Sequence, residues 1–255
     1  MQELTFSFFG TQLVEIDQAA DQILVADSFA VHDGRARSLD RHITRFNRAA
    51  SELTDLDLSS FWAAVIDHIP GDGSFFPRIE LTKDGLIVRI RSVPDFKPTV
   101  TLWTSDEPDK RVSPLTKGPD LAYGTMLRRK ANLHGADEAI ILNEEGLISD
   151  GALSAIVWWE GDTIYGLDES TKWLPSVTRM DIFDLANQAG FKTGTRSISP
   201  SELHCLEVWS LSSLSGIRPV TYWIGENFTP GKTVHLESFQ RRLRLMARDI
   251  HDSFG

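Results

Sequence analysis

Three places in the sequence combine hydroxyl groups, backbone amides or an arginine in a way that suits the binding of an anion. The first is the stretch SVTRMDIF from Ser176, which is predicted to begin a helix, and the second is the serine-rich loop SLSSLSG over 210–216. The third is Arg45, in another predicted helix. The N-terminus of a helix offers unpaired N–H groups and a partial positive charge, so it suits a phosphate group. An ordinary structural role stays open for each place, because Ser176 and Thr178 can cap a helix, serines fill turns and Arg45 can lie on a solvated face.

Lys117 lies in the loop PLTKGPDLAYG, between a proline and a Gly-Pro pair and just before a predicted helix. A lysine in a loop is usually a solvated charge. The alternative is a partly desolvated amine that loses its proton and acts as a nucleophile. Nothing within this stretch alone decides between the two roles.

The first hundred residues, which would carry Arg45, are predicted to mix short strands with two helices. Apolar residues recur at helical spacing around Arg45, which places this arginine off the buried stripe. Two alternating runs joined by Asp84 and Gly85 predict a hairpin. The strands are expected within 22–31 and 77–93, and the helices over 37–53 and 58–69.

The remaining elements are predicted to form a second, larger domain over 115–255, joined to the smaller domain 1–103 by a polar, proline-containing linker at 104–114. Ser199 and Glu202 form a capping-box pattern. Strands and helices alternate without a regular βαβ period, so the sequence predicts an α+β fold. In the second domain we expect a hairpin over 154–166 and helices over 120–135, 176–190 and 236–252.

The composition excludes several classes of function. A net charge of −10 repels nucleic-acid backbones and anionic membrane surfaces. Cys205 is the single cysteine, so an internal disulfide and a CxxC site are excluded, and the seven histidines form no metal-binding pattern. No signal peptide and no apolar run of the ~20 residues needed to span a bilayer is visible. We therefore expect a soluble cytoplasmic protein with neither a metal, a nucleic-acid partner nor a membrane partner.

The order of the motifs resembles that of the class IV aminotransferases. These fold-type IV enzymes use pyridoxal 5'-phosphate and include branched-chain and D-amino-acid transaminases and 4-amino-4-deoxychorismate lyase. DGRARSLDRHITRFNRAA is similar to the family's Asp-Gly turn and His-x-x-Arg helix, and KGPDLAYGTMLRRKANLHGADEAIILNEEGLISDG resembles the stretch from the catalytic lysine to an acidic residue before glycine. WLPSVTRMDIFDLA and SLSSLSGIRPV resemble two further family motifs, in the family's order and at compatible intervals.

The resemblance implies a role for each matched residue. Lys117 matches the Schiff-base lysine, which must be able to lose its charge and move a proton. Asp150 matches the carboxylate that faces the pyridine nitrogen and stabilises its protonated form. The other implied cofactor contacts are Leu174 against the ring and, for the phosphate, Arg45, Val177, Thr178 and Ser213. The resemblance also implies a two-domain fold like that of D-amino-acid aminotransferase, with the active site at the domain interface, and a homodimer.

The chain departs from the family's pattern at several positions. Asp150 is one methylene shorter than the usual glutamate, and the segment that borders the substrate has Ala30 where arginine is common. Asp120 stands where many members have asparagine, and we expect an acid so close to Lys117 to hold the lysine charged. Ser28 and Arg78 are candidate substrate contacts, with a turn serine and a surface arginine as the structural alternatives.

Three functions follow from the resemblance. The leading one is a 4-amino-4-deoxychorismate lyase that forms p-aminobenzoate and pyruvate through a Schiff base on Lys117, favoured by the length of 255 residues. The second is a branched-chain or D-amino-acid transaminase. The third, suggested by Asp120 and the altered N-terminal segment, is a non-catalytic protein that binds the cofactor or another protein.

Overall fold

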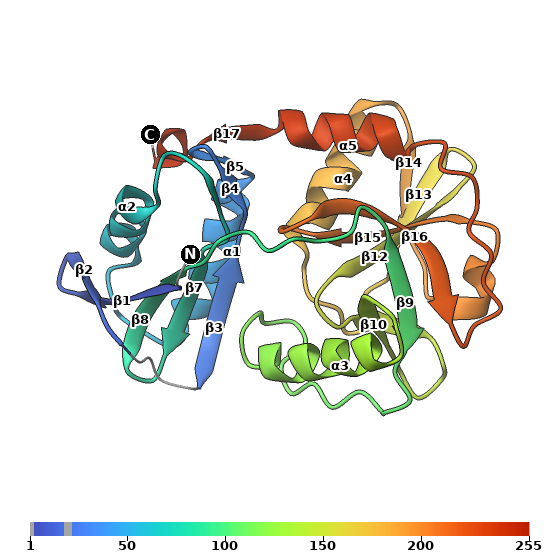
Figure 1. The fold of residues 1–255 in the computed structure, drawn as a ribbon, viewed down its shortest axis with the longest axis horizontal. Helices are drawn as coiled ribbons and strands as arrows, with labels where there is room; N and C mark the ends of the chain where they lie inside the picture. The colour runs from blue at the N-terminus through green and yellow to red at the C-terminus, as the bar shows by residue number, and fades with distance from the viewer. Residues whose placement is uncertain (1–2, 18–21, 255) are drawn as a thin grey trace. The chain divides into compact units, whose positions relative to one another are not determined.

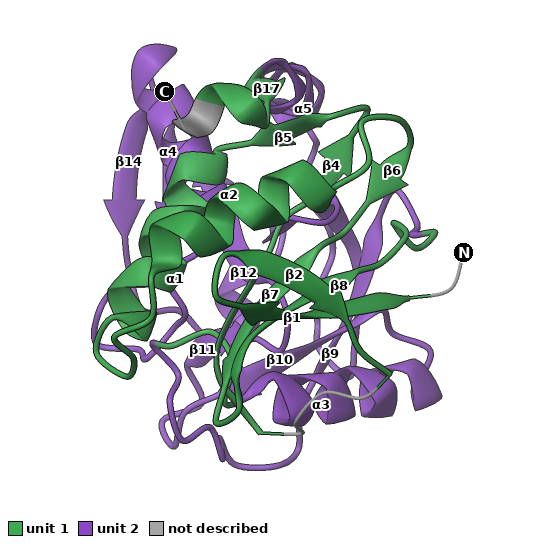
Figure 2. Cartoon of the chain, turned by 90° about the vertical axis from the view of Figure 1, so that its left-hand side faces the viewer, with its two compact units in different colours: residues 1–95, 116–119, 246–255 green, residues 96–115, 120–245 purple. Residues whose placement is uncertain are grey.

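Two units, the first with two sheets and the second with one, make up the computed structural model, which describes residues 3–17 and 22–254. Within these residues, unit 1 comprises the chain up to residue 95 together with 116–119 and 246–254, and unit 2 comprises 96–115 and 120–245 (Figure 2). The sequence-based domain ranges also include residues 1–2, 18–21 and 255, which lie outside the described residues. The mixture of strands and helices in both units agrees with the predicted α+β class.

The sheet of unit 1 is antiparallel, with its strands in the order β2-β1-β8-β7-β3 (Figure 1). The predicted hairpin is confirmed, since β7 and β8 pair directly and Gly85 in their connection has a φ of 125°. A second, four-stranded sheet has the order β17-β5-β4-β6. The strands of unit 1 are β1 (Leu4–Phe9), β2 (Gln12–Glu15), β3 (Ile23–Ser28), β4 (Val31–His32), β5 (Arg35–Arg37), β6 (Ser74–Phe75), β7 (Arg78–Thr82), β8 (Gly85–Ile90) and β17 (Ala247–Asp249).

Two helices contribute to the core of unit 1, α1 (Leu39–Ala50) and α2 (Leu58–His68). Helix α1 buries most of the predicted apolar stripe, with Phe46 fully buried, and it lies against β3. The pattern placed Arg45 off this stripe, but its side chain is only 17% exposed, because it pairs with an aspartate of β3. The Asp57 side chain caps α2 by accepting hydrogen bonds from two backbone N–H groups of its first turn. This packing fixes the residues of α1 that face β3, Arg45 among them.

The sheet of unit 2 has eight strands in the order β11-β10-β9-β16-β15-β12-β13-β14. It is mixed, because β9 runs parallel to both β10 and β16 and β13 runs parallel to β14. Trp158 and Trp223 are among the fully buried side chains of its core. The strands are β9 (Val100–Thr104), β10 (Glu138–Leu142), β11 (Ile148–Gly151), β12 (Ala155–Glu160), β13 (Thr163–Gly166), β14 (Lys192–Thr195), β15 (Glu207–Ser212) and β16 (Gly216–Ile224).

The helices of unit 2 begin and end largely as their caps predict. Ser176 is the N-cap of α4, and its hydroxyl accepts a hydrogen bond from the Arg179 N–H at 3.2 Å. Ser199 and Glu202 form the predicted capping box, on a single 3₁₀ turn, η1. None of the helices in residues 3–17 and 22–254 has the length and apolar character to cross a membrane. The helical elements are α3 (Leu121–Leu133), α4 (Val177–Gln188), η1 (Pro200–Leu203) and α5 (Leu236–Leu245).

The C-terminal helix is shorter than predicted. It ends at Leu245, whereas the sequence pattern predicted a helix as far as residue 252. Residues 247–249 instead form β17, which pairs antiparallel with β5, and the short turn η2 (His251–Phe254) follows. Ile250 donates its backbone N–H to Gly34 O at 3.0 Å and is buried in the core of unit 1. These pairings between distant residues outweigh the local preference for a helix.

The segment 116–119 lies against β3 in unit 1, whereas the sequence-based boundary placed it in the second domain. The Ala26 N–H donates a hydrogen bond to Lys117 O at 2.7 Å. Gly118 has a φ of +140°, and a Cβ on it would come within 2.9 Å of the Val25 and Ala26 backbone. The contact therefore requires glycine at 118, for its backbone conformation and for the close approach.

We predict that Gly118→Ala destabilises the protein by on the order of 1–3 kcal/mol, because a strained φ and a backbone clash must both be accommodated. The free energy of unfolding can be measured in urea. Gly71→Ala is the matched control in the same unit, since a Cβ on Gly71 would meet nothing within 4 Å. Equal effects of the two substitutions would contradict the docking of residues 116–119 on β3.

Candidate active site

Lys117 is half-buried, and the pKa of its ammonium is lowered to about 8. The largest cause is desolvation, and the charges of Arg45, Arg91 and Arg78 act in the same direction, whereas the Asp27 carboxylate raises the pKa. At neutral pH a substantial fraction of the amine is therefore unprotonated. This is the state that a nucleophilic lysine requires.

Asp27, on β3, holds two side chains of α1 in unit 1. It is fully buried, and its oxygens accept from Arg45 Nε at 2.8 Å and Arg45 Nη2 at 2.8 Å. The His42 ring nitrogen Nδ1 lies 2.7 Å from Oδ1, and the backbone N–H of Ser28 donates to the same oxygen at 2.7 Å. Desolvation alone would raise the pKa of Asp27, but Arg45 and His42 outweigh it and hold the pKa well below its usual value. Asp27 is therefore an ionised partner of Arg45.

The hairpin β7–β8 and the residue that follows it add further arginines to this unit. Arg78 and Arg89 both donate to Glu80, which is fully buried. The Arg91 Nε donates to Phe76 O at 3.2 Å, and its guanidinium carbon lies 4.9 Å from the centre of the Phe76 ring. The Arg91 Nη2 atom is buried and has no hydrogen-bond partner among the described residues. Desolvation lowers the pKa of Arg91 to about 10. Positive charge therefore exceeds negative charge around Lys117, which suits an anionic ligand.

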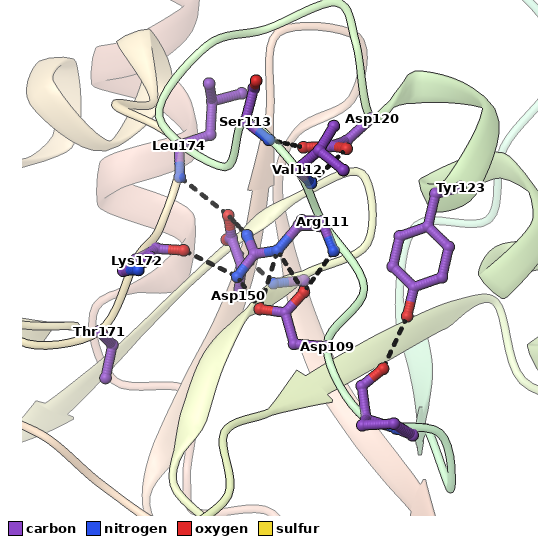
Figure 3. A network of polar contacts seen from close by, with 12 residues as sticks. Asp109, Arg111, Val112, Ser113, Asp120, Tyr123, Asp150, Thr171, Lys172 and Leu174 are labelled. Atoms are coloured by element: carbon purple, nitrogen blue, oxygen red, sulfur yellow. Dashed lines mark hydrogen bonds and ion pairs between the residues drawn. The ribbon is translucent and has the colours of Figure 1, made fainter.

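In unit 2, Asp150 on β11 is held by three donors (Figure 3). Its Oδ2 accepts from the Leu174 N–H at 2.9 Å and from Arg111 Nη1 at 3.2 Å, and its Oδ1 accepts from the Gly151 N–H at 3.0 Å. Burial raises the pKa of Asp150 to about 7, against the opposite effects of Arg111 and the backbone donors. Arg111 is itself fixed by Asp109 and by Lys172 O. Arg111 thus links the segment 105–115 to the strand that carries Asp150.

Asp120 has a different role from the one expected. Its two carboxylate oxygens accept the backbone N–H groups of Val112 and Ser113, each at 2.9 Å (Figure 3). The carboxylate thus stabilises the loop before the Lys117 segment. Because the pKa of Lys117 is lowered rather than raised, the expectation that Asp120 keeps the lysine charged is not met.

The predicted anion-binding residues of unit 2 lie at the start of α4 and in the turn between β15 and β16. Val177 and Thr178 are buried in the first turn of α4, and Ser213 lies in the turn, which a contact of 2.8 Å between the Ser212 and Ser215 hydroxyls closes. Arg179 in the same first turn of α4 donates to Leu167 O at 2.7 Å and lies over the Trp173 ring. Its pKa is lowered to about 10 by burial.

The structure thus brings the predicted residues together in two sets. Unit 1 gathers Lys117 with Arg45 and Arg78, and unit 2 gathers Asp150 with Leu174. Ser28 is buried at the end of β3, beside Asp27. Sequence reasoning assigned no role to Asp27, His42 and Arg111, which hold these sets in place, or to Arg91, whose charge lowers the pKa of Lys117. Asp27 could have been recognised from the sequence, because a charged residue is unusual in a mainly apolar run such as ILVADSFAV. Arg111 could not, because an arginine in a polar linker is ordinary.

The chain is similar in sequence and in fold to several known proteins. The sequence profile described as Amino-transferase class IV matches residues 24–223. A D-alanine aminotransferase from Bacillus licheniformis is 25% identical over 232 residues, which cover 81% of each chain. A hypothetical aminotransferase from Mycobacterium tuberculosis, solved in its PLP-bound form, has a TM-score of 0.79 and 16% identity over 98% of this chain and 100% of that one. A solved structure from Legionella pneumophila that carries the name of a 4-amino-4-deoxychorismate lyase has a TM-score of 0.74 and 16% identity over 87% of this chain and 90% of that one.

The lowered pKa of Lys117 predicts that its amine becomes reactive with a midpoint near pH 8, more than two units below an ordinary lysine. Acetylation of the apoprotein by acetic anhydride, followed by peptide mass spectrometry across a pH series, measures this midpoint. Arg45→Met should move it upward, because Arg45 is the largest charge effect that lowers the pKa. A midpoint near pH 10 in the unmutated protein would contradict the described environment.

Proposed function

Since this chain belongs to the class IV aminotransferase family, we propose that it transfers the amino group of an amino acid to a keto acid. The family's members are enzymes that depend on pyridoxal 5'-phosphate, and the chain has their fold, as the sequence predicted. The observation that carries the proposal is the environment of Lys117, a desolvated amine with a lowered pKa among three arginines.

The groups of the described residues fit the cofactor chemically. An aldehyde requires an amine that can lose its proton, and the pKa of Lys117 near 8 provides one. A phosphate requires charged or N–H donors, which Arg45 and the first turn of α4 at Val177 and Thr178 can supply, together with the Ser213 turn. The protonated form of the pyridine nitrogen requires a carboxylate to stabilise its charge, which Asp150 can supply.

In this proposal Lys117 has two tasks. It would hold the cofactor and would afterwards accept, on Nζ, the proton that leaves the substrate's α-carbon. Asp150 would face the ring nitrogen, and a cation there would replace part of the solvation that Asp150 has lost, which favours its ionised form. Arg111 and the Leu174 N–H fix the direction of that carboxylate. When bound, the cofactor supplies an electron sink.

Substrate recognition is proposed for unit 1. Arg78 lies near enough to Lys117 to lower its pKa, and the Ser28 backbone lies beside Asp27. An arginine beside the reactive amine suits the carboxylate of an amino acid. Ser28 and Arg78 therefore remain the proposed substrate contacts.

The lyase that was favoured from the sequence becomes the second candidate. The curated relative from Bacillus licheniformis is named an aminotransferase, whereas the lyase-named structure shares only 16% identity and supports the fold alone. Both reactions use the same lysine for the first proton removal, so the residues around Lys117 serve either. The two candidate functions predict different results when an amino acid is added without a keto acid, because only a transaminase would then convert its cofactor to the aminated form.

We expect the purified protein, supplied with pyridoxal phosphate, to be yellow, and borohydride reduction to fix the cofactor on Lys117, as found by peptide mass spectrometry. D-Alanine or a branched-chain amino acid alone should convert the bound cofactor to its aminated form, and a keto acid should restore the yellow colour. Lys117→Ala should abolish these changes. A protein that takes up no added pyridoxal phosphate would contradict the proposal. Production of p-aminobenzoate from 4-amino-4-deoxychorismate, without amination of the cofactor, would decide for the lyase.

We expect Asp150→Asn to lower kcat by about 100-fold, because a neutral amide cannot stabilise positive charge at the ring nitrogen. Cofactor attachment to Lys117 should persist, which separates a catalytic loss from a loss of binding. Asp109→Asn is the matched control, since it also removes a carboxylate from Arg111 but leaves Asp150 in place. Single-turnover rates with excess amino acid measure both variants, and equal losses would contradict the role of Asp150.

A further inference from the structure

We propose that Asp27 is a positioning residue, which holds the Arg45 guanidinium in the direction needed to bind the phosphate of the cofactor. This inference rests on the proposed role of Arg45. Asp27 itself would touch neither the cofactor nor the substrate. It would act through the orientation of Arg45.

The first support is the geometry of the pair. Arg45 donates Nε and Nη2 to the two carboxylate oxygens of Asp27, at 2.8 Å in each case. Such a two-point contact fixes the plane of the guanidinium as well as its position. Because the guanidinium is planar, this contact with β3 fixes the orientation of the whole group rather than leaving it to the rotation of a long side chain.

The second support is the burial of Asp27, which leaves its carboxylate no alternative position. It is 0% exposed, and a buried charge is tolerated only when its partners compensate it. The Ser28 N–H and the His42 ring supply two contacts of 2.7 Å in addition to the two from Arg45. His42 lies one helical turn before Arg45 on α1, so the carboxylate contacts successive turns of the helix. The pair therefore fixes α1 to β3 at the residue that would bind the phosphate.

The third support is that the same strand positions the proposed nucleophile. Ala26, next to Asp27, donates its backbone N–H to Lys117 O at 2.7 Å. Adjacent residues of β3 thus hold the backbone of Lys117 and the side chain of Arg45. One strand thus holds both the backbone that carries the proposed nucleophile and the guanidinium proposed to bind the phosphate.

The charge of Asp27 and its effect on the orientation of Arg45 have opposite consequences for the binding of an anion by Arg45. An ionised Asp27 offsets the charge of Arg45 and so weakens its long-range attraction for an anion. The ordering of the arginine side chain, however, is completed before the cofactor arrives. Arg78 and Arg91 keep the surroundings of Lys117 positive. We therefore expect orientation to outweigh the lost charge.

The test compares the affinity of the full-length apoprotein for pyridoxal phosphate and for pyridoxal, which lacks the phosphate. Asp27→Asn keeps the size of the side chain but removes its charge. Loss of the Asp27 charge also lowers the pKa of Lys117, and this change affects both ligands alike. We therefore expect this variant to lower the affinity for pyridoxal phosphate relative to that for pyridoxal about tenfold, the effect of one charge-assisted hydrogen bond. Absorbance titrations measure both dissociation constants. An unchanged ratio of the two affinities, or a ratio that shifts in favour of pyridoxal phosphate, would overturn the proposal.

A double-mutant comparison separates positioning from a general structural effect. In an Arg45→Gln background, Asp27→Asn should not change the affinity for pyridoxal phosphate relative to that for pyridoxal, because Asp27 acts on the phosphate through Arg45. A further tenfold fall in this ratio would overturn the proposal. Should unmutated protein bind neither ligand, the proposed function itself fails, and that outcome is distinct from a failure of the role of Asp27.

A second variant keeps the proposal falsifiable if Asp27→Asn does not fold. Arg45→Lys retains the positive charge but cannot make the two-point contact with Asp27. We expect it to weaken the binding of pyridoxal phosphate about tenfold relative to pyridoxal. Full affinity in Arg45→Lys would show that charge alone anchors the phosphate, and would overturn the proposal.

Discussion

The arrangement of the candidate residues in unit 1 depends on the backbone of β3. Its Ala26 N–H binds Lys117 O, and the absence of a Cβ at Gly118 lets the two backbones approach closely. A backbone contact of this kind fixes the chain at Lys117 and Gly118 without constraining the lysine side chain. The amine can therefore be placed by the fold and still rotate, which suits a group that must both hold a ligand and move a proton.

Burial acts on the two principal titratable groups in opposite directions. It lowers the pKa of Lys117 to about 8 and raises that of Asp150 to about 7. Each shift favours the neutral form, since desolvation penalises charge of either sign. Both pKa values therefore lie close to neutral pH. Nearby charges act differently on the two groups. Arg111 opposes the shift of Asp150, whereas at Lys117 the neighbouring arginines add to the shift and Asp27 opposes it.

Local patterns in the sequence predicted the turns and helix starts, which are determined by residues close to one another in the chain. The Asp84–Gly85 turn predicted the hairpin β7–β8, and Ser176 predicted the start of α4, because the determinants of turns and caps lie within a few residues. The end of the C-terminal helix could not be predicted in this way, since residues 247–249 pair with β5. The contacts of Asp27 with Arg45 and of Arg111 with Asp150 likewise join residues that are distant in the sequence. The contacts of Asp120 with the N–H groups of Val112 and Ser113 were overlooked because a charge interaction with Lys117 was expected. The family resemblance supplied the candidate residues, and the structure adds which side chains hold them.

The pairing of β17 with β5 also bears on how the protein is made. Arg35 and Ala247, joined by a hydrogen bond from Arg35 Nη2, are separated by 212 positions. On the ribosome, β5 emerges long before its partner strand, so its edge stays open while all of unit 2 is synthesised. Open strand edges invite association with other chains. The small sheet and the core beside it are therefore completed only after residues 247–249 and Ile250 have been synthesised.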